Sequence, residues 1–317
     1  MKQVDLGTQG LRVPTIGLGC MGMSDFYGSS SEAQNLSVLD RAAEIGCTFW
    51  DTADMYGPFT NERLLAKALK GRRDRITLAT KFGVCRGEDG SWQGLRGDAA
   101  YVKTCCDASL KRLGTDYIDL YYQHRVDPET PIEETVGAMA DLVKAGKVRF
   151  IGLSEADPET IVRAHAVHPL SALQTEYSLW SREVESEILP TLQRLKIGFV
   201  AYSPLGRGFL SGAIRSRSDL KAGDWRLENP RFSDEAFANN IRLADLVGEV
   251  AQALDVSAAQ VALAWLRSRD LPIAAIPGTR RIERLEENWA SQDIVLPAEH
   301  VDRLEALIAQ GVVGDRY

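Results

Sequence analysis

The feature of this sequence that most limits its fold is a regular alternation of short β-branched or aromatic runs with longer amphipathic stretches. Such alternation predicts parallel strands joined by helices. About eight repeats of the unit fit a closed (β/α)8 TIM barrel better than an open sheet. No linker or composition break divides the chain, so residues 1–317 are expected to form a single domain. The predicted strands are Thr15–Gly19, Thr48–Asp51, Ile76–Lys81, Tyr117–Gln123, Val148–Ser154, Ala172–Thr175, Ile197–Tyr202 and Ile273–Pro277.

The amphipathic stretches between and after these strands predict the helices. They are Ser31–Ile45, Asn61–Leu69, Asp98–Leu113, Pro131–Lys144, Pro158–Val167, Ser181–Leu195, Asn239–Arg269, Arg280–Trp289 and Ala298–Gln310. Ahead of the first strand, Val4–Leu6 and Leu11–Val13 flank Gly7–Gly10, a pattern that predicts a β-hairpin over the barrel bottom. Two connections, Gly83–Gly97 and Leu205–Ala238, are long and follow strand carboxyl ends, where barrels of this type build active sites.

Charge and composition exclude several classes of partner. A net charge of −7 and a pI near 5.3 leave no basic face for nucleic acid or an anionic membrane. No long uncharged apolar run is present, and Met1–Gly10 lacks the apolar core of a signal peptide. The five cysteines contain no Cys-x-x-Cys pair, which indicates reduced thiols and a cytoplasmic location. No cluster has metal-ligand spacing, so we expect no metal, and no pattern specifies an oligomeric state.

The segment Gly17–Gly22 spells G-x-G-x-x-G directly after a predicted strand. This is the dinucleotide fingerprint of an open doubly wound sheet, but it requires a helix N-terminus immediately behind the glycines. Here Met23–Ser30 contains Asp25, Gly28 and serines, so the next helix begins too late. We interpret the match as a glycine-rich strand end and favour the barrel.

Polar side chains follow three consecutive predicted strands at their carboxyl ends. Asp51 ends the second strand with Tyr56 in the loop behind it, Lys81 ends the third, and His124 ends the fourth. The set suits carbonyl reduction by hydride, which needs a proton donor for the developing alkoxide. An ammonium near a tyrosine favours the phenolate, a carboxylate keeps the lysine charged, and a neutral histidine donates a hydrogen bond to the carbonyl oxygen. Each residue alone also fits a structural role, but their convergence favours catalysis.

Several blocks of the chain resemble the signature blocks of the aldo-keto reductases. They are Trp50–Gly57, Ala79–Lys81, Tyr121–His124 and Tyr202–Gly206. The likeness extends from Val4 to about Gln310, and Gly19–Gly28 and Ile276–Asn288 resemble the microbial and plant-type branch. The resemblance implies that Tyr56 is the general acid, that Lys81 and Asp51 tune it, and that His124 orients the carbonyl of a small-molecule aldehyde or ketone.

The same resemblance implies binding of NADPH/NADP+. Ser154 and Gln174 would bond the nicotinamide carboxamide, and Tyr202 would stack on the ring. A loop of small residues would line the pyrophosphate. The remaining residues that the resemblance places at the coenzyme are Met21, Asp51, Ser203, Pro204, Leu205, Gly206, Gly208 and Gly278.

The helix predicted after the last strand, Arg280–Trp289, carries the features expected for an adenosine 2′-phosphate. Thr279 stands at its start, and Arg280 and Arg284 are four residues apart, which would place both on one helix face. These residues predict a clamp that selects NADPH over NADH. Glu287 and Asn288 match the adenine contacts of the family, whereas a solvated charged helix face is the alternative.

The substrate pocket is predicted less sharply. Phe26, Tyr27, Trp92 and Trp225 are candidates for its wall, with ordinary packing as the rival explanation. Arg125 is expected either to meet a polar substrate group or to pair with Asp127. Two other functions remain open at this point: an NADPH-binding redox-sensing subunit with little turnover, and an aldolase or lyase that forms a Schiff base on Lys81.

Overall fold

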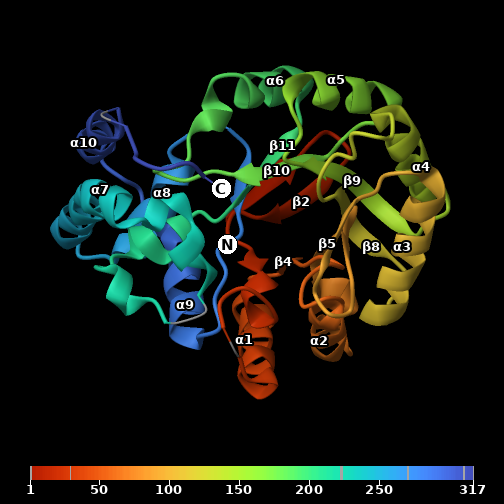
Figure 1. Cartoon of the computed structure of the whole chain (residues 1–317), viewed down its shortest axis with the longest axis horizontal. Helices are drawn as coiled ribbons and strands as arrows, with labels where there is room; N and C mark the ends of the chain where they lie inside the picture. Colours follow the sequence, from red (N-terminus) through yellow and green to blue (C-terminus); the bar gives the residue numbers. More distant parts are fainter. Residues whose placement is uncertain (1, 29, 222–223, 270, 310, 317) are drawn as a thin grey trace.

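The computed structural model describes residues 2–28, 30–221, 224–269, 271–309 and 311–316. Its main sheet has eight strands in the order β12-β11-β10-β9-β8-β5-β4-β3, and all neighbours are parallel. Parallel bridges from Ile16 to Ala275 and from Gly19 to Gly278 join the first strand to the last. The sheet therefore closes, and the predicted (β/α)8 barrel is confirmed (Figure 1).

The elements lie close to their predicted positions. The barrel strands are β3 (Leu18–Gly19), β4 (Phe49–Asp51), β5 (Thr77–Phe82), β8 (Ile118–Gln123), β9 (Val148–Ser154), β10 (Ala172–Glu176), β11 (Gly198–Tyr202) and β12 (Ile273–Ala275). The helices are α1 (Glu32–Ile45), α2 (Thr60–Leu69), α3 (Ala99–Leu113), α4 (Ile132–Lys144), α5 (Pro158–Val167), α6 (Ile188–Leu195), α7 (Asp234–Ala253), α8 (Ala258–Arg267), α9 (Ile282–Ala290) and α10 (Ala298–Ile308). The helices surround the strands, as expected when both faces of a parallel sheet are covered (Figure 1).

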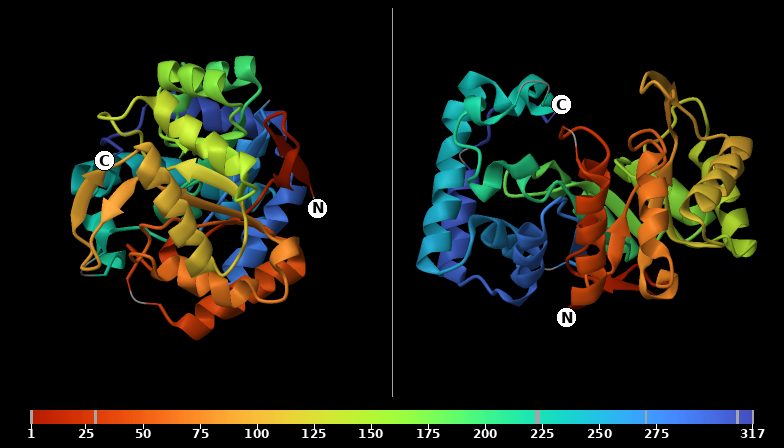
Figure 2. Two further views of the ribbon diagram at one scale, coloured as in Figure 1. Left: turned by 90° about the vertical axis from the view of Figure 1, so that its right-hand side faces the viewer. Right: turned by 90° about the horizontal axis from the view of Figure 1, so that it is seen from below.

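The predicted N-terminal hairpin is present as β1 (Gln3–Leu6) paired antiparallel with β2 (Leu11–Pro14). Leu6, Leu11 and Val13 are buried in one cluster with residues of the barrel strands, including Leu120 and Val200. The hairpin thus plugs one end of the barrel with apolar side chains. Figure 2 (left) shows it on the opposite side of the molecule from a second hairpin, β6 (Val84–Arg86) with β7 (Trp92–Leu95).

Some helix boundaries differ from the prediction, each for a local reason. The stretch Asn239–Arg269 is not one helix: α7 and α8 meet at 92°, because Asp255 turns the chain in the left-handed region and Ser257 starts α8 with a capping box to Gln260. The helix predicted from Ser181 begins only at Ile188. The helix predicted from Arg280 begins at Ile282. The predicted end of the last helix, Gln310, lies outside the described residues.

No single helix in the described part of the chain is long and apolar enough to cross a membrane; only the bent pair α7 and α8 passes that test, and only when taken together.

The two long connections both carry structure of their own. Gly83–Gly97 contains the hairpin β6–β7, which the sequence did not indicate. Leu205–Ala238 contains four short 3-10 helices before the start of α7: η4 (Gly206–Ser211), η5 (Arg217–Asp219), η6 (Trp225–Glu228) and η7 (Pro230–Phe232). Both connections follow strand carboxyl ends and therefore lie at the rim opposite the N-terminal hairpin.

The contact between this hairpin and the barrel predicts a stability difference between two glycine substitutions. A Cβ added at Gly198 in β11 would lie 2.6 Å from Leu6 Cα, whereas one at Gly248 in α7 would meet nothing within 4 Å. We expect Gly198→Ala to lower the free energy of unfolding by about 1–3 kcal/mol through overpacking. Gly248→Ala should raise it by about 0.5–1 kcal/mol because alanine favours a helix interior. Denaturant titration of both variants tests this, and equal effects would contradict the packing of the hairpin plug.

Candidate active site

A cavity of about 530 Å³ opens at the carboxyl ends of the barrel strands. Most residues predicted for catalysis, coenzyme or substrate line it. They are Met21, Phe26, Tyr27, Asp51, Tyr56, His124, Arg125, Ser154, Gln174, Tyr202, Ser203, Pro204, Leu205, Gly208, Trp225, Gly278, Thr279 and Arg280. Strand ends that are far apart in the sequence thus meet at one cavity.

Several predicted residues do not line this cavity. Trp92 lies on the β6–β7 hairpin with 64% of its surface exposed, so it does not form part of the wall. Gly206 instead faces Trp180, whose ring a Cβ there would meet at 2.7 Å. A small residue is therefore required at this position by packing. Arg284, Glu287 and Asn288 also lie outside the lining.

Lys81 lies directly behind the cavity and is fully buried. Its Nζ donates to Asp51 Oδ1, to the backbone oxygen of Thr52 (2.8 Å) and to Tyr56 Oη (3.3 Å). Gln174, from the opposite part of the barrel, donates from Nε2 to Asp51 Oδ2 at 2.7 Å. Because an ammonium has three N–H bonds, this arrangement satisfies all of them and holds Lys81 as a cation.

The charges of this cluster are set by burial and by contact. Burial alone would lower the pKa of Lys81, but the Asp51 carboxylate and the Tyr56 phenol more than offset it, so this pKa lies above its ordinary value of 10.5. Burial raises the pKa of Tyr56 above 10.0, while the nearby Lys81 acts in the opposite direction. The expectation of a tyrosine more acidic than usual is therefore wrong in this structure, because burial outweighs the ammonium. Tyr56 is protonated throughout the neutral range.

His124 stands beside Tyr56 at the rim. The two rings are in edge-to-face contact, with centroids 5.7 Å apart. Burial lowers the pKa of His124 well below 6.5, and the positive charges of Lys81 and Arg125 act in the same direction. Its Nδ1 is buried and has no hydrogen-bond partner among the described residues. This environment therefore favours a neutral imidazole, which can donate a hydrogen bond to a ligand or accept one from it.

Of the residues predicted for the adenosine phosphate, Thr279 and Arg280 line the cavity, whereas Arg284 does not. Arg280 donates to the backbone oxygens of Tyr27 (2.9 Å) and Gly28 (3.2 Å). Arg280 precedes α9, so the argument that it shares a helix face with Arg284 is wrong. Arg284 instead pairs with Glu287 at 2.6 Å. Asn288 is buried, and its Oδ1 has no hydrogen-bond partner among the described residues, as expected of a residue that awaits a polar ligand.

Sequence reasoning missed several residues at the cavity. Arg207 and Arg226 line it from the long connection after β11, where no pattern marked them. Met55 lines it beside Tyr56, within a block that did carry a signal. Arg86 of β6 pairs with Asp25 and donates to the Met55 backbone oxygen at 2.9 Å, so the β6–β7 hairpin holds the loop that presents Tyr56.

Among the residues that the structure describes, no group of three or more His, Cys, Asp or Glu side chains is placed to hold a metal ion.

The fold and the site together define a (β/α)8 barrel with a buried lysine–aspartate–tyrosine cluster at its carboxyl rim. The model of the aldo/keto reductase family matches residues 15–309. This chain belongs to the aldo/keto reductase family.

Solved structures of similar proteins agree with this membership. A thermostable aldo-keto reductase in complex with the inhibitor epalrestat is 29% identical, with a TM-score of 0.78 over 97% of this chain and 100% of that one. An aldo/keto reductase from Klebsiella pneumoniae in complex with NADP and acetate is 29% identical, with a TM-score of 0.77 over 100% and 99%. A glycerol dehydrogenase from Gluconobacter oxydans, 23% identical, shares the fold with a TM-score of 0.88 over 98% and 96%.

The burial of His124 predicts a pH dependence of stability. Its pKa is depressed in the folded state, so its contribution is fully present above the unfolded value of about 6.5 and is lost as the pH falls below it. Relative to a His124→Gln variant, wild-type protein should lose up to about 1.4 kcal/mol of unfolding free energy per pH unit below 6.5. Denaturant titrations of both proteins at pH 7.5 and 5.5 measure the difference. A pH-independent gap would show that folding does not shift the pKa of His124.

Proposed function

We propose that this protein reduces an aldehyde or ketone to the alcohol with NADPH, with Tyr56 as the proton donor. The observation that carries the proposal is the hydrogen bond of 3.3 Å between Lys81 Nζ and Tyr56 Oη at the edge of the cavity. It supports the proposal because a protonated phenol backed by a buried cation can donate its proton to a carbonyl oxygen that acquires negative charge. The coenzyme, when bound, supplies the hydride.

The chain's own residues then have distinct tasks. Tyr56 donates its proton to the carbonyl oxygen, and Lys81 stabilises the phenolate that remains because its charge lies next to that oxygen. Asp51 keeps Lys81 charged, and Gln174 holds Asp51 in place. Neutral His124, in contact with the Tyr56 ring, is placed to orient the same carbonyl.

The residues present fit the coenzyme. Ser154, Gln174, Tyr202, Thr279 and Arg280 all line the cavity. Ser203 and Gly208 also line it, and at both positions the backbone has a positive φ angle, 48° and 94°. Small residues at such positions let a backbone approach a phosphate closely. That a similar protein from Klebsiella pneumoniae was solved with NADP supports this assignment.

The Schiff-base alternative has weaker support. A nucleophilic lysine needs a neutral amine with an open path to the substrate. Lys81 is fully buried, and Asp51, the Thr52 carbonyl and Tyr56 accept its hydrogen bonds. The redox-sensing alternative predicts coenzyme binding without turnover, and steady-state assays separate it from the reductase.

Replacing Tyr56 by phenylalanine tests the proton donor. The ring is retained, so coenzyme affinity should change little, while turnover falls by at least about 10²-fold, the usual scale for a general acid. NADPH oxidation and quenching of protein fluorescence by coenzyme measure the two quantities. Tyr117→Phe is the matched control, because Tyr117 precedes β8, at the opposite end of the strand from His124. Near-normal turnover in Tyr56→Phe would refute the assigned role.

Arg280 provides the test of coenzyme choice. A charge-assisted hydrogen bond contributes roughly 1.5–3 kcal/mol, so Arg280→Ala should raise the Kd for NADPH by about 10- to 100-fold. The Kd for NADH, which lacks the 2′-phosphate, should change little. Arg284→Ala should have a smaller effect, because that side chain is 42% exposed and paired with Glu287. Equal losses for both coenzymes would mean that Arg280 only supports the loop at Tyr27 and Gly28.

A further inference from the structure

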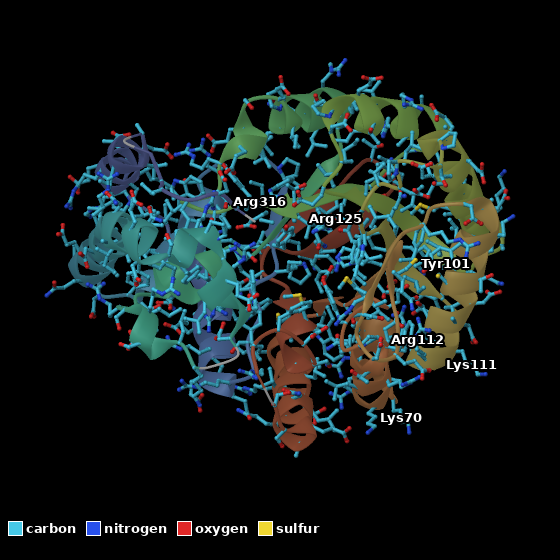
Figure 3. All side chains as sticks on the ribbon, viewed as in Figure 1. Lys70, Tyr101, Lys111, Arg112, Arg125 and Arg316 are labelled. Carbon is cyan, nitrogen blue, oxygen red and sulfur yellow. The ribbon has the colours of Figure 1, made fainter. Side chains whose placement is uncertain are left out.

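Arg125 is a cation at the catalytic end of the cavity. It follows His124 directly after β8, is half-buried and lines the same cavity as Tyr56. Figure 3 shows it toward the middle of the molecule, whereas Lys70 and Lys111 project from the outer rim. Its charge influences both His124 and Tyr56. A ligand whose carbonyl meets Tyr56 therefore lies within the electrostatic reach of this guanidinium.

Among the residues that the structure describes, the hydrogen-bond partners of Arg125 are all neutral. Its Nη1 donates to the backbone oxygen of His124 at 2.6 Å and to Ser154 Oγ at 3.3 Å. In the described part of the chain no carboxylate lies within 4.0 Å, and Nε and Nη2 have no acceptor. The pairing with Asp127 that the sequence allowed is absent there, because Asp127 accepts hydrogen bonds from Gly97, Glu129 and Thr130 instead.

The other arginines that line the cavity are engaged differently. Arg207 forms an ion pair with Glu176, and Arg226 with Asp224. Arg280 also lines the cavity, and its charge acts on Asp224. Within the described lining, Asp51 is the one acidic side chain, and Lys81 neutralises it. The positive charge at Arg125 is therefore not balanced by the cavity wall.

We propose that Arg125 binds a carboxylate of the substrate, so that the preferred substrates are aldehydes or ketones that carry a carboxylate group. The inference rests on the proposed reduction at Tyr56. A guanidinium with two donors unused is shaped for the two oxygens of a carboxylate, and a half-buried charge without an anion is costly. A single cation matches a singly charged carboxylate better than a phosphate dianion. The coenzyme phosphates are assigned to Thr279, Arg280 and the loop from Ser203 to Gly208, so they do not supply the anion.

The experiment compares matched pairs of carbonyl compounds that differ only in charge. The pairs are 4-carboxybenzaldehyde with 4-carbamoylbenzaldehyde, 4-oxobutanoate with 4-oxobutanamide, and pyruvate with pyruvamide. At saturating NADPH, kcat/KM in at least one pair should be about tenfold or more higher for the carboxylate than for the amide. Because Arg125 is half-exposed, we expect a ratio close to about tenfold. The ratio should fall to about one in Arg125→Met and Arg125→Gln, and Arg125→Lys should retain part of it.

A binding measurement gives a readout that does not depend on turnover. Benzoate should bind the complex of enzyme and NADP+ more tightly than benzamide in calorimetry, and Arg125→Met should remove the difference. Phenyl phosphate tests the rival anion, and tighter binding than benzoate would overturn the choice of carboxylate. Arg280→Ala is the matched control, a cavity arginine whose loss should leave the carboxylate-to-amide ratio unchanged.

The outcomes distinguish this inference from the proposed function. If wild-type enzyme reduces the neutral compounds with NADPH but favours no carboxylate, or if Arg125→Met keeps the wild-type ratio, the carboxylate site is refuted and the reductase stands. If none of the compounds is reduced with NADPH while the coenzyme binds, the proposed function fails and the inference fails with it.

Discussion

The closure of the barrel between β3 and β12 is the constraint on which the rest of the structure depends. Gly17 N donates to Ala275 O at 2.8 Å, and Ala275 N donates to Thr15 O at 2.9 Å. The backbones approach so closely that a Cβ at Gly17 would lie 2.7 Å from Phe49 O, and one at Gly19 would lie 2.7 Å from Ile276 O. Gly19 therefore permits the close approach at the seam, and Gly17 permits the close approach of the neighbouring strand β4. The G-x-G-x-x-G pattern is not a dinucleotide fingerprint, since α1 begins only at Glu32.

Closure also creates the electrostatics of the site. It brings the ends of β4, β5 and β10 together, so Asp51, Lys81 and Gln174 bond one another away from water. Buried ion pairs are often replaceable by apolar residues without loss of stability, so stability alone does not account for this one. A fully satisfied cation beneath the Tyr56 hydroxyl, at the wall of a cavity, is instead the arrangement expected where charge develops during a reaction.

The parts of the fold and site that the sequence predicts are those encoded locally. Each barrel strand can be predicted from the residues of its own segment. The parallel topology then places a polar side chain at the carboxyl end of a strand on the rim, and Asp51, Lys81 and His124 were predicted as rim residues in this way. The sequence-based predictions fail where contacts between segments far apart in the chain determine the position of a residue. Gly206 is required by the Trp180 ring, and the exposure of Trp92 follows from a hairpin whose turn the sequence did not reveal. The break between α7 and α8 is instead a local feature, formed by the left-handed turn at Asp255 and the capping box at Ser257.

The charge of the cavity is the property that local patterns hide most completely. Arg207 is neutralised by Glu176 at the end of β10, and Arg316, in the C-terminal tail (Figure 3), pairs with Glu155 next to Ser154. Arg207 and Asn229 both donate to the Arg316 backbone oxygen, which ties the tail to the long connection after β11. No sequence pattern marked Arg207 or Arg226 as cavity residues, and none shows which arginines the fold neutralises. Only the three-dimensional pairing separates these structural cations from Arg125, whose described partners are all uncharged.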